Sequence, residues 1–268
     1  ISSSDINSSS KIFEKVIVND SEAPSSVPEA YLKLHLLSYR LVKPNETNLD
    51  GIFGVLKNIV WTSEGPFSVD DFRKKQMETK EVNKHILVHS VDKFPRMTDY
   101  VILSDVRIAD ANRVRLGAHL GPGTTVMHEG FVNFNAGSLG EAMIEGRISQ
   151  GVVIGDKTDI GGGASTMGTL SGGNEVKISL GKNCLLGANS GLGIPLGDRC
   201  TVEAGLYLTA ASKVEIVNDQ GEITNILKAS ELSSKSDLLF IRNSLSGSIQ
   251  CRPNKNISEL NEELHSNE

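Results

Sequence analysis

The sequence predicts a mainly β protein built around a parallel β-helix. Between Val106 and Leu208 an aliphatic residue recurs every six positions, often followed by Gly, Ala or Glu, as in Leu180-Gly181, Leu186-Gly187 and Leu192-Gly193. A period of six fits neither an amphipathic helix nor an alternating strand. It is typical of hexapeptide solenoids, whose short parallel strands are joined by tight turns. We therefore expect each aliphatic residue to point into the core and the small residue after it to permit a close or left-handed backbone.

The repeat region is flanked by segments without this period. Residues 1–10 are rich in Ser and are expected to be a disordered lead-in. Residues 11–105 predict an N-terminal α/β domain, residues 106–210 the β-helix domain, and residues 211–268 a C-terminal cap. A cap is expected because the last coil of a solenoid would otherwise expose unpaired strand edges.

Local patterns predict the elements before the repeat. Helical spacing of apolar residues predicts a helix over 28–42, and Ser68 is a plausible N-cap for a second helix over 68–80, with Asp70 and Asp71 in its first turn. The pattern over 51–62 fits either a helix or a strand. Strands are predicted over 12–18, 85–91 and 100–103.

The repeat is interrupted twice, and other elements follow it. The step from Leu192 to Leu196 is four residues, which predicts a shortened turn, and the Gly-rich residues 170–176 predict a bulging loop. After the repeat, residues 213–217 and 222–227 predict a hairpin around Asn218 to Gly221. Strands over 238–242 and 248–251 and a short helix over 257–265 are expected next.

Composition restricts the class of partner. The 268 residues carry a formal net charge of −6, and no basic stripe suggests nucleic-acid binding. No apolar run approaches about 18 residues, so no membrane span is expected, and the first residues lack the features of a signal peptide. Cys184, Cys200 and Cys251 lack CxxC spacing and are expected to be buried thiols of a cytoplasmic protein.

Most of the unusual polar residues lie between Gly121 and Gly168. Glu145 and Arg147 flank one glycine, so a carboxylate that can accept a proton lies near a guanidinium that can bind a substrate carboxylate; a structural ion pair is the alternative. His128-Glu129 lacks the second His of a zinc motif, and the glycines at 161–163 open no helix, which argues against a dinucleotide site. Free backbone N–H groups at such corners can still bind a carbonyl or a phosphate.

Longer runs are more specific than the hexapeptide pattern. They include residues 30–38 (AYLKLHLLS), 49–54 (LDGIFG), 60–63 (VWTS), 90–96 (SVDKFPR), 113–119 (RVRLGAH), 124–133 (TTVMHEGFVN), 145–149 (EGRIS), 161–165 (GGGAS), 185–193 (LLGANSGLG) and 202–207 (VEAGLY). With these runs the chain resembles the tetrahydrodipicolinate N-succinyltransferase family, of the actinobacterial type, over about residues 28 to 265.

The resemblance implies a fold, a reaction and an assembly. The solenoid would be a left-handed parallel β-helix, and the protein would be a homotrimer with active sites between subunits. It would transfer succinyl from succinyl-CoA to the amino group of the acyclic form of tetrahydrodipicolinate, 2-amino-6-oxopimelate, in the succinylase branch to diaminopimelate and lysine. Its partners would be small-molecule substrates, with no nucleic acid and no membrane.

The resemblance also assigns roles to residues. Glu145 would be the catalytic glutamate, as a general base in preference to an acyl-anhydride role, because an amine attacking a thioester needs only deprotonation and positioning. The N–H of Gly168 would donate to the thioester oxyanion. The residues expected to bind succinyl-CoA are Arg147, Gly162, Ser165, Ala188, Glu203, Ala204, Lys228, Phe240, Ile241, Arg242 and Asn243.

One departure from the family pattern concerns a metal. Some relatives hold a divalent cation on the trimer axis with an Asp and a Glu. Glu129 matches that Glu, but Asn112 stands at the Asp position. The loss of one negative charge per subunit predicts that Mg²⁺ binds weakly or not at all.

Two other functions fit the same scaffold. One is an acyltransferase that uses acetyl-CoA, and the other is a non-catalytic hexapeptide scaffold protein. A carbonic anhydrase is disfavoured because His119 and His128 are the only histidines of the repeat region, one too few for a three-His zinc site. For the acceptor's carboxylates, charge alone suggests Lys93, Arg96, Arg113 and Arg115.

Overall fold

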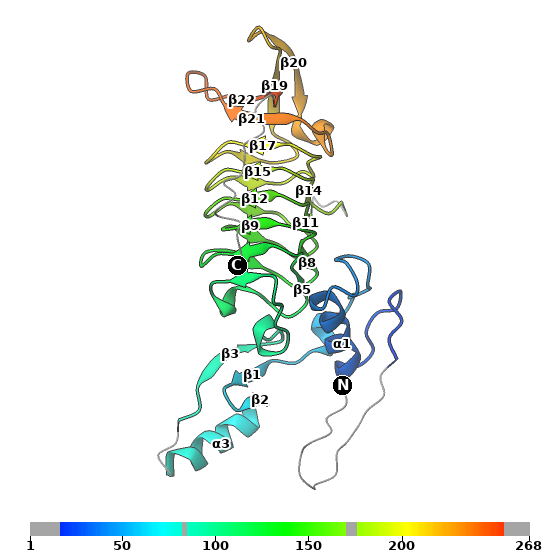
Figure 1. Cartoon of the computed structure of the whole chain (residues 1–268), viewed down its shortest axis with the longest axis vertical. Helices are drawn as coiled ribbons and strands as arrows, with labels where there is room; N and C mark the ends of the chain where they lie inside the picture. Colours follow the sequence, from blue (N-terminus) through cyan, green and yellow to red (C-terminus); the bar gives the residue numbers. More distant parts are fainter. Residues whose placement is uncertain (1–16, 82–84, 170–175, 255–268) are drawn as a thin grey trace.

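The computed structural model describes residues 17–81, 85–169 and 176–254. Four sequence predictions lie wholly or mostly outside these residues: the lead-in over 1–10, the strand over 12–18, the loop over 170–176 and the helix over 257–265. Figure 1 shows a tall column of coils, with the helices at one end and a β-hairpin at the other.

The described residues of the N-terminal region contain three α-helices and a small antiparallel sheet of order β2-β1-β3. Its elements are α1 Val27–Ser38, α2 Ile52–Val55, β1 Ile59–Thr62, β2 Gly65–Phe67, α3 Val69–Glu81, β3 Val88–Asp92 and the 3-10 turn η1 Met97–Asp99. The ambiguous segment over 51–62 therefore contains both a short helix and a strand.

Local chemistry explains where the two longer helices begin. Ser26 caps α1, because its hydroxyl accepts from the N–H of Glu29. The hydroxyl of Ser68 accepts from the N–H of Asp71 at the start of α3, which confirms Ser68 as the N-cap. The strand predicted over 100–103 is wrong: Tyr100 ends the η1 turn and the next three residues have no regular structure.

The repeat region winds through three parallel sheets in turn, which we call the first, second and third faces. The first face contains β4 Arg107–Ile108, β6 Thr124–Val126, β9 Ala142–Ile144, β12 Thr158–Ile160, β15 Leu185–Leu186 and β17 Thr201–Val202. The second contains β7 Phe131–Val132, β10 Arg147–Ile148, β13 Ser165–Thr166, β16 Gly191–Leu192 and β18 Tyr207–Leu208. The third contains β5 Ala118–His119, β8 Ala136–Ser138, β11 Val153–Ile154 and β14 Ser179–Leu180. A short 3-10 turn, η2 Ala111–Arg113, follows β4.

The repeating aliphatic residues form stacked rows inside the coils. In the first face Val126, Ile144, Ile160, Leu186 and Val202 are all fully buried. The prediction that they point into the core is confirmed. The glycines that follow them serve close approach: a Cβ on Gly155 would lie 2.6 Å from backbone atoms of the next coil. The left-handed backbone conformation at the corners is adopted largely by residues other than these glycines, such as Asn183 and Asn189.

One continuous hydrophobic core joins the N-terminal region to the first coils. Leu34 and Leu37 of α1 belong to the same buried cluster as Leu116 and Phe134. The ring of Phe134 stacks on that of Phe94 with centroids 4.2 Å apart. The predicted boundary near residue 105 therefore falls at a packed junction.

The last coil is covered by four longer strands, β19 Lys213–Val217, β20 Ile223–Lys228, β21 Leu238–Arg242 and β22 Ile249–Pro253, and by the 3-10 turn η3 Ala229–Leu232. The predicted hairpin is confirmed as the antiparallel pair β19–β20. Strand β21 pairs with β17, so the first face continues into the cap and its edge is not left open.

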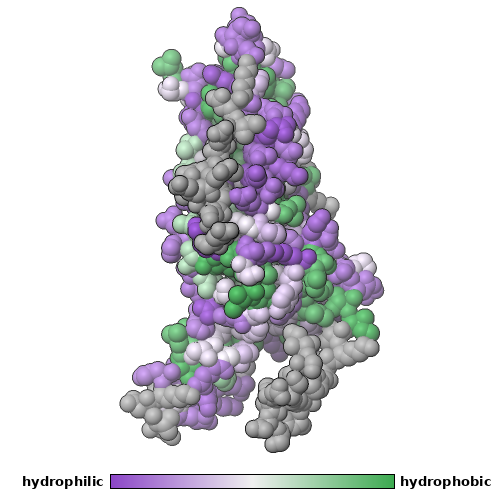
Figure 2. Space-filling view, viewed as in Figure 1, coloured by the Kyte–Doolittle hydropathy of each residue, from purple (hydrophilic) through white to green (hydrophobic). Residues whose placement is uncertain are grey.

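The three cysteines, Cys184, Cys200 and Cys251, are buried, as the sequence predicted. Burial raises the pKa of Cys251 to about 12. On the face drawn in Figure 2, the coloured residues of the coils are mostly hydrophilic, and hydrophobic ones gather toward the helical end. In the described part of the chain, no helix is long and apolar enough to cross a membrane.

Candidate active site

A shortened corner between the first and second faces exposes Glu145. In the other described coils, four residues separate the first-face strand from the second-face position that pairs in register, as between Ile160 and Ser165. Between Ile144 and Arg147 there are only two, Glu145 and Gly146. This corner is therefore recessed between longer corners above and below it.

Gly146 makes the tight corner sterically feasible. A Cβ at this position would lie 2.3 Å from the carbonyl oxygen of Ala164 and 2.7 Å from the side chain of Ile160. The neighbouring backbone is pinned by a hydrogen bond from the N–H of Glu145 to the oxygen of Ile160, 2.8 Å. The exposed Glu145 side chain thus projects from a rigid support.

Three other candidate residues lie on the coil of Glu145 or on the next coil. A carboxylate oxygen of Glu145 lies 3.8 Å from the point where a Cβ of Gly162 would be. The Nε and Nη2 of Arg147 donate to the hydroxyl of Ser165 at 3.1 and 2.9 Å. Within the described residues, the N–H of Gly162 donates no hydrogen bond, so it can bind a ligand oxygen.

A buried hydroxyl ties the two strands of this site together. Thr166 interrupts the aliphatic row of the second face and is 1% exposed. It donates to the carbonyl of Arg147 at 3.0 Å and accepts from the N–H of Ser149 at 3.2 Å. Ser149 donates in turn to the carbonyl of Thr166 at 2.6 Å. These bonds fix the strand that carries Arg147.

Gly168 lies at the other end of the second face. The strand register places it next to Gln150, whose carbonyl oxygen would be 3.1 Å from a Cβ on Gly168. Strand β10 lies between the two sites, with Glu145 at the corner before it and Gln150, beside Gly168, at the turn after it. One chain therefore does not bring Glu145 and Gly168 to the same reacting atom.

The candidate coenzyme residues lie mainly on the coil corners above Gly162. Ala188 and Glu203 follow the first-face strands β15 and β17, and the carboxylate of Glu203 accepts from the N–H of Arg242 at 2.6 Å. Ala204, next to Glu203, is exposed, and Ile241, next to Arg242, is half-buried. The Asn243 side chain accepts from the N–H groups of Leu245 and Ser246 and shapes the turn that follows β21.

Phe240 and Lys228 are placed differently from the other candidate coenzyme residues. The side chain of Phe240 is fully buried, and its carbonyl accepts from the N–H of Glu203 at 2.9 Å. Phe240 can therefore act in this site only by holding the backbone of Glu203. Lys228 ends the cap hairpin, where its N–H donates to the carboxylate of Glu231 at 2.8 Å and its side chain is exposed.

The candidate metal residues have no cluster around them. Asn112 donates from both its N–H and its side-chain amide to the carboxylate of Asp110, at 2.9 and 3.0 Å, and Glu129 is exposed. Across the described residues, no group of three His, Cys, Asp or Glu could hold a metal ion. His119 is buried and contacts the carbonyl of Val42 through Nδ1 at 3.2 Å, and burial lowers its pKa.

The cations suggested for the acceptor already have partners. Arg115 pairs with Asp92 at 2.7 Å and lies over the ring of Phe94. Arg96 pairs with Asp99 at 2.6 Å, and Arg113 lies 4.0 Å from Asp110. The ammonium of Lys93 donates to the backbone oxygens of Phe53 and Leu56.

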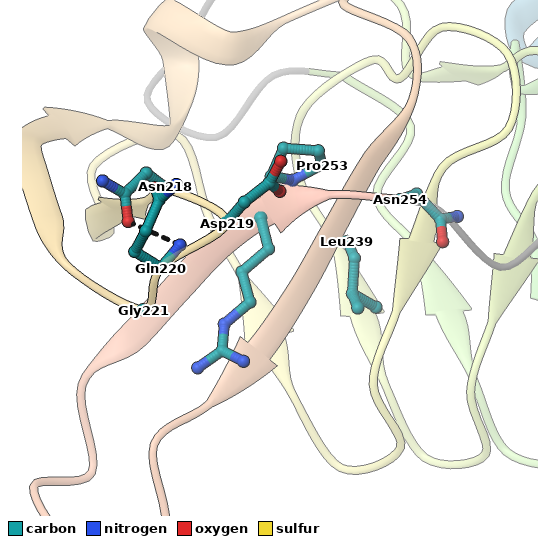
Figure 3. A pocket seen from close by; sticks show the side chains of 8 residues that line it. Asn218, Asp219, Gln220, Gly221, Leu239, Pro253 and Asn254 are labelled. Atoms are coloured by element: carbon teal, nitrogen blue, oxygen red, sulfur yellow. Dashed lines mark hydrogen bonds between the residues drawn. The ribbon is translucent and has the colours of Figure 1, made fainter.

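The C-terminal cap contains a cavity that none of the candidate residues lines. Its volume is about 380 Å³, and it lies between the tip of the β19–β20 hairpin and the strands β21 and β22 (Figure 3). The side chain of Asn218 accepts from the N–H of Gln220 at 3.1 Å and stabilises that tip. This cavity is separate from the corner that presents Glu145.

Comparison with known proteins decides the family. Family models described as tetrahydrodipicolinate N-succinyltransferase N-terminal and middle match residues 1–54 and 56–96, and a hexapeptide repeat of succinyl-transferase matches 177–210. A 2,3,4,5-tetrahydropyridine-2,6-dicarboxylate N-succinyltransferase of Vibrio cholerae is 59% identical over 94% of this chain and 74% of its own length. The chain belongs to the tetrahydrodipicolinate N-succinyltransferase family.

Further relatives agree with this membership. Enzymes with the same name from Pseudomonas aeruginosa and Pseudomonas putida are 56% and 55% identical, over 96% and 93% of this chain and 75% and 72% of theirs. A crystal structure described as a 2,3,4,5-tetrahydropyridine-2-carboxylate N-succinyltransferase from Campylobacter jejuni matches with a TM-score of 0.82 and 40% identity. The match covers 88% of this chain and 65% of that one, slightly under two thirds.

The family resemblance is thus confirmed, and the actinobacterial type stays a prediction. The recessed corner was missed in the sequence, although a signal for it exists there. The buried residues of the corner, Ile144 and Ile148, are four positions apart, whereas the equivalent residues Val126 and Val132 are six apart. The sequence analysis used the four-residue step from Leu192 to Leu196 to predict a shortened turn. The step from Ile144 to Ile148 has the same length and marks the candidate catalytic residue.

Proposed function

We propose that this chain transfers succinyl from succinyl-CoA to the amino group of acyclic tetrahydrodipicolinate, in the succinylase branch of diaminopimelate and lysine biosynthesis. The observation that carries the proposal is the 59% identity to the Vibrio cholerae N-succinyltransferase over 94% of this chain. The recessed corner, with an exposed carboxylate beside a free N–H and a guanidinium, supports the same chemistry. The chain would act in the cytoplasm.

In this mechanism Glu145 is the general base. It takes a proton from the substrate ammonium, and the freed amine attacks the thioester carbonyl carbon. A C–N bond forms and the C–S bond breaks, and the nitrogen gives its second proton to the departing CoA thiolate, so that the products are the amide and CoA-SH. The N–H of Gly168 donates to the oxyanion of the tetrahedral intermediate, an interaction worth about 3 kcal/mol. Arg147, held by Ser165, stabilises the negative charges of the bound substrates.

A homotrimer of left-handed β-helices would complete this site. In one chain Glu145 and Gly168 lie at opposite ends of the second face, yet both would be needed within a few ångströms of the same thioester. Two chains side by side can meet this requirement, with Glu145 from one and Gly168 from its neighbour. The separation within one chain therefore supports active sites between subunits.

The coenzyme would lie along the corners from Gly162 to Arg242. Ala188 and Ala204 offer small side chains past which an extended pantetheine can run, and Lys228 and Arg242 supply cations for its phosphates. Glu203 and Asn243 would hold the backbone of this groove, as their hydrogen bonds to Arg242 and to the following turn indicate.

The residues at the metal position fit Mg²⁺ poorly. A hard divalent cation prefers several charged oxygen ligands, and Asn112 supplies an amide whose nitrogen is engaged by Asp110. No catalytic step is assigned to a metal. We expect no saturation by Mg²⁺ at low millimolar concentration in a titration calorimeter, and full occupancy there would contradict this expectation.

The donor is tested by CoA thiol release with tetrahydrodipicolinate as acceptor, comparing succinyl-CoA with acetyl-CoA. The proposal predicts a much larger kcat/KM with succinyl-CoA. A strong acetyl-CoA preference would assign the chain to the alternative acyltransferase class, and no release with either donor would favour a non-catalytic scaffold.

A further inference from the structure

A row of outward-facing residues runs along the second face, one from each coil. Parallel pairing places Arg147 beside Ser165, Ser165 beside Gly191, and Gly191 beside Tyr207. The residues that follow them in the four strands are buried in the core: Ile148, Thr166, Leu192 and Leu208. The row therefore runs from the recessed corner to the coils that carry the candidate coenzyme residues.

The ring of Tyr207 lies over Gly191. A Cβ on Gly191 would lie 2.2 Å from Cε2, 2.3 Å from Cδ2 and 2.5 Å from Cζ of this ring. Gly191 is buried although it faces outward, because the ring covers it. Since the Tyr207 hydroxyl is bonded to Cζ, it lies away from its own strand and toward the strand of Ser165. Adjacent strands are about 4.8 Å apart, so about one strand spacing separates the end of the ring from that strand.

Arg147 approaches the same place from the other side. Its Nε and Nη2 donate to the hydroxyl of Ser165 at 3.1 and 2.9 Å. The guanidinium therefore lies over the strand that pairs with the Gly191 strand. Arg147 and Tyr207, at the two ends of the row, thus converge over its two middle positions.

The groups that meet there can donate further hydrogen bonds. Tyr207 is 48% exposed, and among the described residues its hydroxyl has no hydrogen-bond partner. In the same part of the chain Nη1 of Arg147 has none either, and the Ser165 hydroxyl accepts from Arg147 while its own proton stays available. Two hydroxyls beside a guanidinium favour an acceptor with a negative charge, and a carboxylate fits a guanidinium best.

We infer that Tyr207 is a specificity-determining residue, which together with Arg147 binds the free carboxylate of the succinyl donor. The phenol O–H donates to one carboxylate oxygen and the guanidinium to the other. This inference rests on the proposed function, since it takes succinyl-CoA to be the donor. Tyr207 lies four residues after Glu203, on a coil of the coenzyme groove, which favours the donor's carboxylate over those of the acceptor. An acetyl group has no such carboxylate, so the contact selects against acetyl-CoA.

The test is titration calorimetry of the full chain with two CoA thioesters, in the absence of the acceptor. Butyryl-CoA has the same acyl chain length as succinyl-CoA but carries a methyl group in place of the carboxylate. The parent chain should bind succinyl-CoA at least about tenfold more tightly. Tyr207→Phe should weaken succinyl-CoA binding about tenfold and leave butyryl-CoA binding unchanged, because it removes one hydrogen bond to a charged group.

Gly191→Ala tests the placement of the ring while the hydroxyl is kept. The three atoms nearest to the new methyl group all belong to the exposed Tyr207 ring, so the ring moves aside and the fold is retained. Succinyl-CoA binding should weaken about as much as in Tyr207→Phe. The double variant should bind no more weakly than either single variant, because both changes remove the same contact.

Tyr39→Phe is the matched control. It removes the hydroxyl of another tyrosine, 46% exposed and outside the row, and should leave the affinity for both thioesters unchanged. Circular dichroism verifies that each variant is folded.

Several results would overturn the inference. Tyr207→Phe could weaken both thioesters equally, which would mean that the ring only packs against the coenzyme, or it could weaken neither. A raised KM for tetrahydrodipicolinate with unchanged succinyl-CoA binding would assign Tyr207 to the acceptor. Equal affinity of the parent chain for both thioesters would exclude a carboxylate site without excluding acyl transfer. Failure of the proposed function looks different: thioesters bind, but no CoA is released from succinyl-CoA with tetrahydrodipicolinate.

Discussion

At the scale of single residues, the candidate site depends on groups that do not themselves touch a substrate. Arg147 is oriented by Ser165, and its strand is held by the Thr166 hydroxyl. The family resemblance predicted Glu145 and Arg147 as site residues, but nothing in the sequence marked Thr166 as more than one polar residue in an aliphatic row. Likewise, the fully buried Lys33 has an ordinary helical spacing, and only the fold supplies the three carbonyls around it.

Replacement of Thr166 by Val should destabilise the fold. Val keeps the volume but leaves the N–H of Ser149 and the carbonyl of Arg147 without this partner, at a cost of about 1–3 kcal/mol. Urea unfolding measures the change. Thr166→Ser, which retains the hydroxyl, is the matched control and should lose less; equal losses in the two variants would show that the hydroxyl contributes nothing.

His119 should make stability depend on pH. Burial lowers its pKa below the ordinary value of 6.5, so the unfolded chain binds a proton at a pH where the folded chain does not. The free energy of unfolding should therefore rise as pH increases from the folded pKa to 6.5, and then become independent of this group. Thermal unfolding of His119→Gln across this window should show a flatter slope. A slope identical to that of the parent chain would exclude His119 as the source.

At the scale of elements, the period of six predicted the coils because each repeat must bury one aliphatic residue, as Ile144, Ile160 and Leu186 do. Turn chemistry predicted the cap hairpin around Asn218 for a similar local reason. The strand predicted over 100–103 failed: Val101 is buried in the hydrophobic core and Leu103 packs partly against it, while Ile102 is 83% exposed. Local pattern cannot separate such a segment from a strand.

The shortened corner should tolerate no side chain at Gly146. In Gly146→Ala the new methyl group would lie 2.3 Å from the carbonyl oxygen of Ala164, so backbone has to move, and we expect a loss of about 3 kcal/mol or more. Gly54→Ala, where nothing lies within 4 Å of the new methyl group, is the control. Urea unfolding of both proteins makes the comparison. A loss below about 1 kcal/mol for Gly146→Ala would mean that the corner is not tightly packed.

At the scale of the whole molecule, the column of coils separates Glu145 and Gly168, the two groups that we propose act in one reaction. Its register follows from the repeat and could be anticipated. The distance between Gly168 and Glu145 could not be anticipated from the sequence, because it depends on which face each residue occupies. A polar cavity of about 420 Å³ where the N-terminal region meets the coils also arises only in the assembled chain, since its lining comes from residues 20–21, 45–50, 135, 150 and 177.

Active sites between subunits predict complementation. Glu145→Ala removes the base, and Gly168→Pro removes the N–H, so each variant alone should be impaired. Co-expressed chains should recover part of the activity, because in mixed trimers some interfaces join an intact Glu145 to an intact Gly168. Sedimentation analysis should give about three times the 28.8 kDa mass of the chain. Mixed assemblies that stay as inactive as the separate variants would contradict shared sites.

The most direct test of the account is the rate of CoA release from succinyl-CoA with tetrahydrodipicolinate for the parent chain and for Glu145→Gln. The exposed carboxylate can be replaced without disturbing the corner, and Glu78→Gln on the exposed surface of α3 is the control. The account predicts rapid release by the parent and the control, and a kcat lower by about 100-fold or more for Glu145→Gln. Equal rates for all three proteins would show that Glu145 is not the general base.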